Sequence, residues 1–336
     1  MKTFGTIAAV AVGVFCWSTG ASANVVIDTV RVGNPGNAGE LSGAGAGGYG
    51  PDRICGSVAY SYNIGRYEVT AGQYTEFLNA VASRDTYGLY NPDMGNTSDD
   101  VLHGFGCNIQ RSGASGNYTY SVASEWAERP VNHISWGSSA RFANWLHNGQ
   151  PTGLQSEYTT EDGSYILHGA TSDADLQAVT RKANATWAIT NEDEWYKAAY
   201  YNPSTSSYFE YATSSNEINT GMANYNLSVG HTTDVGSYAY SSPYGTFDQS
   251  GNVWEWNEAV INDPLYGSYR GQRGGSFDYD YDTLHAAFGS RGYPSIGRRH
   301  TGFRVVEVPE PAALSLLALG GVMVLRRRPR TPSVPD

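Results

Sequence analysis

The chain has 336 residues and a formal net charge of −11, with 40% hydrophobic and 16% charged residues. This length allows one large domain with a sizeable core. The acidic balance argues against a nucleic-acid ligand, because phosphates are bound by Lys and Arg, and it suits a soluble protein outside the cell.

Residues 1–23 have the pattern of a secretory signal peptide. Lys2 gives a positive start, Ile7–Trp17 is a short apolar stretch, and Ala21-Ser22-Ala23 is a small-residue cleavage site. The alternative is a buried N-terminal helix. We expect an exported chain whose mature form begins at Asn24.

Two cysteines remain after removal of the signal peptide, Cys55 and Cys107. In an oxidising compartment an even pair predicts a disulfide, which would stabilise the fold by up to about 4 kcal/mol for a loop of this size. The alternative is a pair of reactive thiols.

Local signals predict three helices, separated by long stretches rich in Gly, Ser, Asn and Tyr that are typical of short strands and ordered loops. The helices begin after the caps Thr70, Ser135 and Asn191, each followed by apolar residues at helical spacing. Val25–Val32 alternates weakly and could form an edge strand. The fold class predicted is α+β with much irregular structure, which needs staples such as a disulfide or a bound ion.

Six sequence blocks resemble the formylglycine-generating enzyme (sulfatase-modifying factor) family and occur in the family's order. The most specific is Gly-Asn-Val-Trp-Glu-Trp, which ends at Trp256. The other blocks are Gly65–Leu78, Arg129–Trp136, Ile189–Trp195, Arg273–Phe277 and Gly302–Val306. The resemblance covers residues 64–306 and implies an elaborated C-type-lectin-like fold for a domain of residues 24–308. Most motif residues also fit a scaffold role, with Trp254, Trp256 and Phe303 in the core and Gly274-Gly275 in a tight turn.

The resemblance also implies a structural calcium site in the Trp-Glu-Trp loop. Carried over to this sequence, its ligands are the side chains of Asp248 and Glu255 and the carbonyls of Gly251 and Val253; a second family site involves Asn224. Oxygen donors suit a hard cation. The alternative is that Asp248 and Glu255 only cap turns and pair with arginine.

The family's oxidation of a sulfatase cysteine to formylglycine uses copper held by two cysteines. They lie three and eight residues beyond the serine of the Gly-Gly-Ser block, which is Ser276 here, so the corresponding residues are Tyr279 and Leu284. Neither supplies a thiolate, and Cu(I) favours sulfur. We therefore expect no copper centre and no catalytic residues, but a groove formed by Ser276, Tyr279, Leu284 and His285.

Residues 309–330 resemble a PEP-CTERM sorting signal. Pro309-Glu310-Pro311 precedes the apolar run Ala312–Leu325 and a basic cluster that begins at Arg326. Fourteen residues cover roughly 21 Å as a helix, short of a ~30 Å hydrocarbon core. The resemblance implies a Gram-negative bacterium, transient membrane retention through a short transmembrane segment, and processing by an exosortase-type enzyme, which leaves the protein at the cell surface or outside the cell.

Two functional hypotheses follow. In the first, the domain keeps the fold without the oxidase site and works as a binding or matrix module for a peptide or glycan, which its 25 Tyr and 8 Trp would suit. In the second, it is a metal- or oxygen-dependent enzyme of the same family with a different centre, using His285 and the loop Asp278–Asp282. That acidic loop also fits a solvated surface segment.

Overall fold

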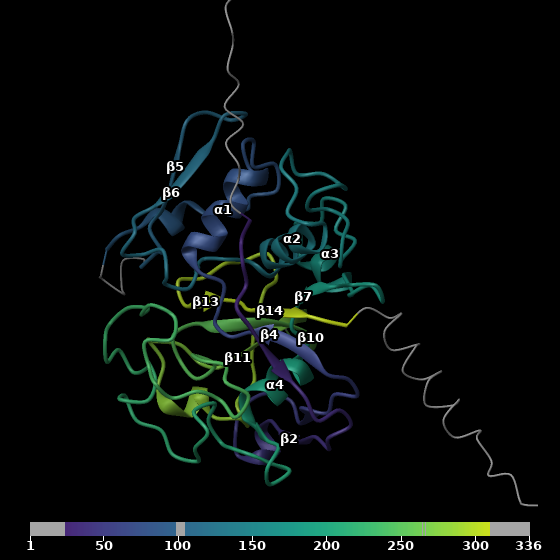
Figure 1. The fold of residues 1–336 in the computed structure, drawn as a ribbon, viewed down its shortest axis with the longest axis vertical. Helices are drawn as coiled ribbons and strands as arrows, with labels where there is room; N and C mark the ends of the chain where they lie inside the picture. The colour runs from purple at the N-terminus through teal and green to yellow at the C-terminus, as the bar shows by residue number, and fades with distance from the viewer. Residues whose placement is uncertain (1–23, 99–104, 264, 266, 310–336) are drawn as a thin grey trace, which may run out of the picture.

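The computed structural model describes residues 24–98, 105–263, 265 and 267–309 (Figure 1). The predicted signal peptide and nearly all of the predicted sorting tail, including 312–325, lie outside the described residues. Within them, no helix combines the length and apolar character needed to cross a bilayer.

One four-stranded sheet joins the beginning and the end of the domain. Its strand order is β1 (Thr29–Val32), β4 (Tyr62–Gly65), β14 (Val305–Glu307), β7 (Trp187–Ile189), and all neighbours are antiparallel. Val306 pairs with Ile64 on one side and with Ala188 on the other. The last described strand therefore lies inside the sheet, and the predicted strand near the N-terminus is its edge.

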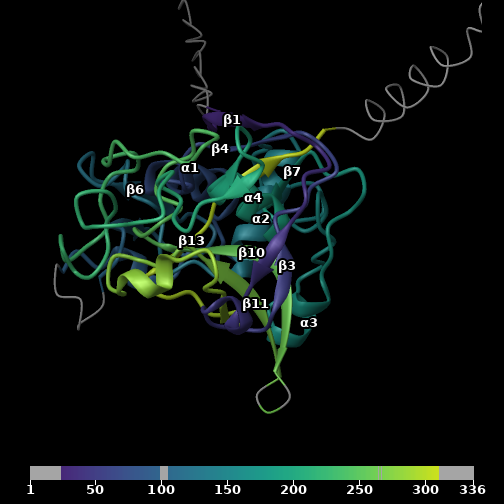
Figure 2. The same ribbon diagram turned by 90° about the horizontal axis from the view of Figure 1, so that it is seen from below.

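A second four-stranded sheet carries the Trp-Glu-Trp block. Its order is β12 (Ser290–Gly292), β11 (Gly267–Arg273), β10 (Trp254–Asp263), β13 (Thr301–Gly302). Strands β10 and β11 form a long hairpin that extends from the body of the molecule (Figure 2), with an irregularity between Trp256 and Val260. The remaining strands pair in twos: β2 (Glu40–Ser42) with β3 (Arg53–Cys55), β5 (Ile109–Ser112) with β6 (Thr119–Val122), and β8 (Tyr201–Asn202) with β9 (Ser207–Tyr208).

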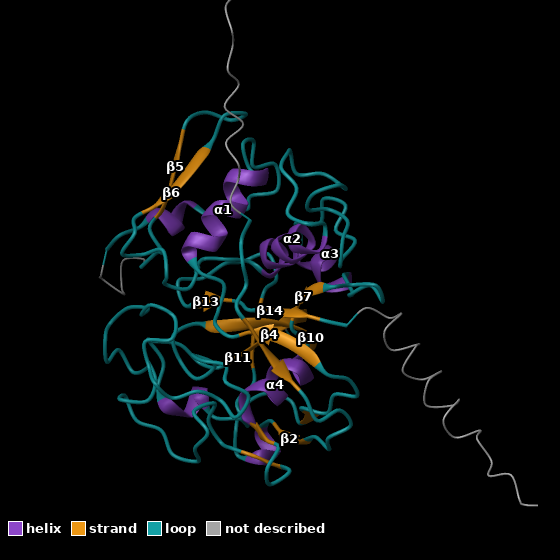
Figure 3. Cartoon of the chain, in the orientation of Figure 1, coloured by secondary structure: helices purple, strands orange, loops and turns teal. Residues whose placement is uncertain are grey.

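The three predicted helices are present as α1 (Ala71–Val81), α2 (Trp136–His147) and α4 (Glu192–Tyr200). Thr70 and Asn191 form reciprocal capping boxes with the residues three positions later, as predicted, and Ser135 caps α2. The short helix α3 (Asp173–Ala178) and the 3-10 turns η1 (Ala44–Ala46), η2 (Pro92–Gly95) and η4 (Tyr281–Leu284) were not predicted. Much of the remaining chain is loop, as Figure 3 shows.

The main core lies where α1 and α2 meet the first sheet. Phe77 packs edge-to-face on Phe142 with 5.3 Å between ring centroids, and Phe142 packs in the same way on Phe303 at 5.4 Å. Trp254, Trp256 and Phe303 are all buried, which confirms their predicted scaffold role. Aromatic contacts of this kind contribute about 0.5–1.5 kcal/mol each beyond the area that they bury.

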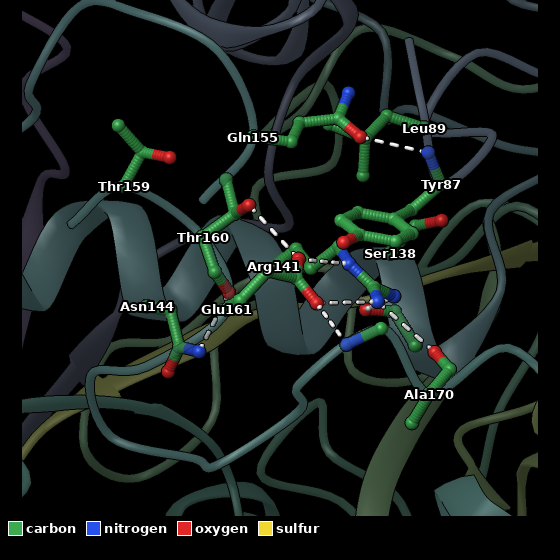
Figure 4. A network of polar contacts seen from close by, with 12 residues as sticks. Tyr87, Leu89, Ser138, Arg141, Asn144, Gln155, Thr159, Thr160, Glu161 and Ala170 are labelled. Carbon is green, nitrogen blue, oxygen red and sulfur yellow. Dashed lines mark hydrogen bonds and ion pairs between the residues drawn. The ribbon is translucent and has the colours of Figure 1, made fainter. Parts of the chain in front are cut away.

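A buried ion pair fastens the irregular segment 148–171 to α2 (Figure 4). Arg141 donates from Nε and Nη2 to the two carboxylate oxygens of Glu161, at 2.7 and 2.9 Å. Arg141 also donates to the Ala170 carbonyl, and Glu161 also accepts from the Gly169 amide. Bidentate pairs of this kind fix geometry as well as charge. In this segment, which has little regular secondary structure, the ion pair and its hydrogen bonds hold the chain against α2.

The predicted disulfide is wrong, because Cys55 and Cys107 are both free and buried. Cys55 is the last residue of β3 and packs in a small aromatic cluster with Trp195 and Tyr196, whereas Cys107 lies in the main core. The two thiols are thus held in separate apolar clusters. Burial raises the pKa of Cys55 to about 12 and that of Cys107 to about 11, so neither is a reactive thiolate at neutral pH.

We expect the unreduced chain starting at Asn24 to show two free thiols per molecule after unfolding in guanidinium. The native protein should react slowly, because both sulfur atoms are buried. Titration with a chromogenic disulfide reagent measures both quantities. A thiol count of zero in the unfolded, unreduced sample would show that the two cysteines form a disulfide after all.

Candidate functional site

Glu255 on β10 is the best-defined charged residue of the Trp-Glu-Trp loop, and its partner is an arginine. Arg304 donates from Nη2 to Oε1 and from Nε to Oε2, both at 2.6 Å, and Trp195 donates from Nε1 to Oε2 at 2.7 Å. Neither member of the ion pair is exposed. Burial by itself would lower the pKa of Arg304, but Glu255 raises it overall. The alternative in which Glu255 pairs with arginine therefore describes this structure, and calcium ligation by Glu255 stays a prediction.

Two other predicted calcium ligands, Asp248 and Asn224, have hydrogen-bond partners of their own near this loop, and Asp248 lies close enough to Glu255 for the Glu255 charge to help raise its pKa. Asp248 accepts from the Gly236 amide at 2.6 Å, and burial raises its pKa to about 6 although Arg304 opposes this. The Asn224 amide donates to the His231 carbonyl, while its Oδ1 atom is buried without a hydrogen-bond partner. Gly251 has a φ of +94°, and a Cβ there would lie 2.3 Å from the Asn224 carbonyl oxygen, so the tight turn needs glycine. Val253 is buried.

One further buried carboxylate, Glu68, adjoins this loop. The Asn252 side chain donates to its Oε1 atom at 3.2 Å, while its Oε2 atom has no partner. Its pKa is raised, first by burial and then by Asp248. No three His, Cys, Asp or Glu side chains within the described ranges are grouped so as to hold a metal. The ligand set with Glu255 does not fit, since Arg304 already neutralises that carboxylate.

The four residues predicted to form one groove lie in different environments in the structure. Ser276 is buried, Tyr279 is 40% exposed, and Leu284 is fully buried against Tyr211 and Tyr225. His285 pairs with Glu210, with 2.9 Å between Nε2 and Oε2. Tyr279 is the most exposed of the four residues, followed by His285, whose side chain is 30% exposed.

Tyr279 belongs to a row of aromatic side chains that come from five separate segments. We call Tyr49, Phe288, Trp254, Tyr279 and His300 the aromatic row. Consecutive ring centroids are 5.2, 5.9, 5.6 and 5.3 Å apart, and the Trp254 and His300 rings stand nearly perpendicular to that of Tyr279. Trp254 in the middle is buried, whereas Tyr49 is 54% exposed. The row therefore has a fixed centre and two exposed tyrosines.

The carboxylate of Asp278 contacts the polar residues at the His300 end of the aromatic row. Ser276 Oγ donates to its Oδ1 atom at 2.6 Å, and Arg299 Nη2 lies 3.2 Å from Oδ2, with His300 Nδ1 3.5 Å away. Burial alone would raise the pKa of Asp278, but His300, Ser276 and Arg299 lower it overall. An ionised Asp278 thus orients His300 and Arg299, and it is not assembled with His285, which contacts Glu210 instead.

Sequence reasoning identified Ser276 and Tyr279 but missed Tyr49, Phe288 and His300. These three are far from Tyr279 in the chain or separated from it by turns, and no local spacing connects them. They are brought together because residue 49 forms an isolated parallel bridge with residue 288 and because Trp254 donates its backbone amide to the His300 carbonyl. A pattern search for aromatic residues alone would not have selected them among 25 tyrosines.

Comparison with known proteins shows what the chain as a whole is similar to. Among curated proteins, hercynine oxygenase of Mycolicibacterium smegmatis is 25% identical over 191 residues, 48% of this chain, and the match spans 45% of that protein's length. Among solved structures, CarF matches with a TM-score of 0.53 and 20% identity, covering 85% of this chain and 99% of CarF. Treponema denticola variable protein 1 matches with a TM-score of 0.55 and 19% identity, covering 86% and 97%. These structures share the α+β fold.

The strongest assignment comes from the family comparison itself. Residues 55–308 match the sulfatase-modifying factor enzyme 1-like domain, which is most of the described chain and contains both four-stranded sheets apart from β1. The six blocks and the observed fold agree with this match. The chain therefore belongs to the sulfatase-modifying factor enzyme 1-like domain family.

Proposed function

We propose that this protein is an exported binding module that does not generate formylglycine, and that the aromatic row binds a glycan. The observation that carries the proposal is the environment of residues 279 and 284. An exposed tyrosine ring occupies the first family cysteine position and a buried leucine occupies the second. The two thiols of the domain are buried elsewhere, and Cu(I) favours sulfur ligands.

The aromatic row has the properties of a rigid contact surface. Tyrosine combines an apolar ring with a polar hydroxyl, and it loses little conformational entropy on binding because it has two side-chain torsions. Sugar rings present the matching combination of apolar C–H faces and hydroxyl edges. The buried Trp254 holds Tyr279 in place, so ordering of this residue costs little when a ligand binds.

A hollow beside Tyr49 extends this surface. It has a volume of about 450 Å³ and lies between the turn at residues 44–51 and the β10–β11 hairpin. Arg291 and Asp263 form an ion pair of 2.6 Å on its wall. A linear chain that stacks on Tyr279 and Tyr49 would continue into this hollow, which favours an oligosaccharide over a single sugar.

Location forms part of the proposal. The signal at residues 1–23 supports export, and the order of elements in residues 309–330 supports transient membrane retention and processing by an exosortase-type enzyme. A protein released at the cell surface of a Gram-negative bacterium would be in a compartment where it can meet extracellular polysaccharide.

We expect the domain of residues 24–309 to be retarded in native gels that contain at least one of a panel of soluble polysaccharides, such as laminarin, xylan, alginate and dextran. Tyr279→Ala and Tyr49→Ala should each weaken binding about tenfold, which corresponds to about 1.4 kcal/mol for one lost stacking contact. Tyr158→Ala is the matched control, because Tyr158 is exposed but lies outside the aromatic row.

Two results would contradict the proposal. The first is unretarded migration in every polysaccharide, or equal retardation of the Tyr279→Ala variant; binding to an extended peptide instead would select the other ligand class. The second is conversion of the cysteine of a sulfatase-motif peptide to an aldehyde in the presence of copper, measured by mass spectrometry.

A further inference from the structure

A strained turn at Asn226-Leu227 lies against the segment that carries Tyr279. Both residues have left-handed backbone angles, with φ of 53° and 55°. Asparagine adopts this conformation with modest strain, but in leucine the Cβ atom crowds the following carbonyl oxygen. Leu227 therefore holds an unfavourable conformation that glycine or asparagine would adopt more easily.

Two backbone hydrogen bonds impose the conformation. The Asn226 amide donates to the Tyr279 carbonyl at 2.6 Å, and the Leu227 amide donates to the Phe277 carbonyl at 2.7 Å. A third bond, from the Ser228 amide to the Tyr225 carbonyl, closes the turn. The turn and the Tyr279 segment thus form one rigid unit, and the strain at Leu227 is fixed beside the aromatic row.

The Leu227 side chain is only half covered by the fold. It is 50% exposed, whereas its neighbours Ala223 and Tyr225 are buried in an apolar cluster. Burial in the folded domain therefore offsets only part of the cost of the strained backbone, because half of the side-chain surface stays in water. Residues held in such conformations concentrate at ligand-binding sites, where the surrounding structure enforces them.

We infer that Leu227 is a ligand-contacting residue, whose side chain packs against the apolar C–H face of the sugar that stacks on Tyr279. This inference rests on the proposed glycan-binding function. It assigns to the site a specificity for sugar units that present an uninterrupted C–H face, because an axial hydroxyl on that face would be desolvated against leucine without a hydrogen-bond partner.

The test compares three proteins in the polysaccharide gel and in a thermal melt. Leu227→Asn relieves the strain and removes the apolar contact, so we expect a melting temperature equal to or a few degrees above that of wild type and binding weakened at least fivefold. Leu227→Met keeps an apolar side chain of similar size on the same backbone, so both its melting temperature and its binding should stay close to wild type.

The outcomes separate the inference from the function on which it rests. If wild type is retarded and Tyr279→Ala is not, but Leu227→Asn binds like wild type, the inference is wrong and the proposed function stands. A lower melting temperature of Leu227→Asn would also overturn it, because the leucine would then serve the fold. If no polysaccharide retards wild type, both are overturned.

Discussion

Replacing Arg304 with methionine is expected to destabilise the domain by about 3–5 kcal/mol, because it leaves the carboxylate of Glu255 buried without a counter-charge. Both side chains of the pair are inaccessible to solvent, and Arg304 also donates to the carbonyls of Gly65 and Phe247. Denaturant unfolding followed by tryptophan fluorescence measures the loss. The double variant Glu255→Met/Arg304→Met should recover much of it, since apolar replacement of a whole buried pair is often nearly neutral.

The matched control is Arg66→Met, which breaks a pair with Asp28 whose side chains are 34% and 59% exposed. Exposed pairs of this kind contribute at most about 1 kcal/mol. The contradicting result involves calcium. If a cation balanced Glu255, a chelator would lower the melting temperature of wild type, by an amount equivalent to about 2.7 kcal/mol at a hundredfold excess over Kd, and Glu255→Ala would abolish that response.

Replacing Arg141 with methionine is expected to release segment 148–171 from α2 at a cost of about 3–5 kcal/mol, because Glu161 would remain buried and charged. The readout is limited proteolysis with chymotrypsin. Tyr165 is fully buried in the folded protein, so faster cleavage after Tyr165, located by mass spectrometry, reports local opening.

Lys182→Met provides the control for this region, because Lys182 pairs with Asp162 at a position where both side chains are partly exposed. Its removal should leave the cleavage rate after Tyr165 nearly unchanged. Equal cleavage rates for wild type and Arg141→Met would mean that the apolar contacts of the segment hold it without the ion pair.

Local sequence signals predicted local structure well. The caps at Thr70 and Asn191 act within three residues, so the helix starts that they specify could be read directly and are observed. The aromatic scaffold roles followed from the family blocks. The hairpin β10–β11 and the placement of β14 depend on pairing between distant segments, which no local pattern encodes.

The differences between the predictions and the structure also come from contacts between distant segments. The disulfide was predicted from the compartment and the even number of cysteines, but Cys55 and Cys107 are delivered to different apolar clusters by the chain fold. For Glu255, the sequence left two partners open for the carboxylate, a bound cation or an arginine side chain. The deciding residue, Arg304, belongs to another family block, and only the parallel pairing of β10 with β13 brings the two blocks side by side.

The position of β14 determines when this protein can fold. Because that strand lies between β4 and β7, the first sheet stays divided into an N-terminal pair and a lone strand until residues 305–307 are available. Closure of this sheet therefore waits for contacts between segments that are far apart in the sequence, and such contacts form slowly. A chain that stops before residue 305 would therefore lack the strand that joins β4 to β7, and Ile64 and Ala188 would both lose their partner Val306.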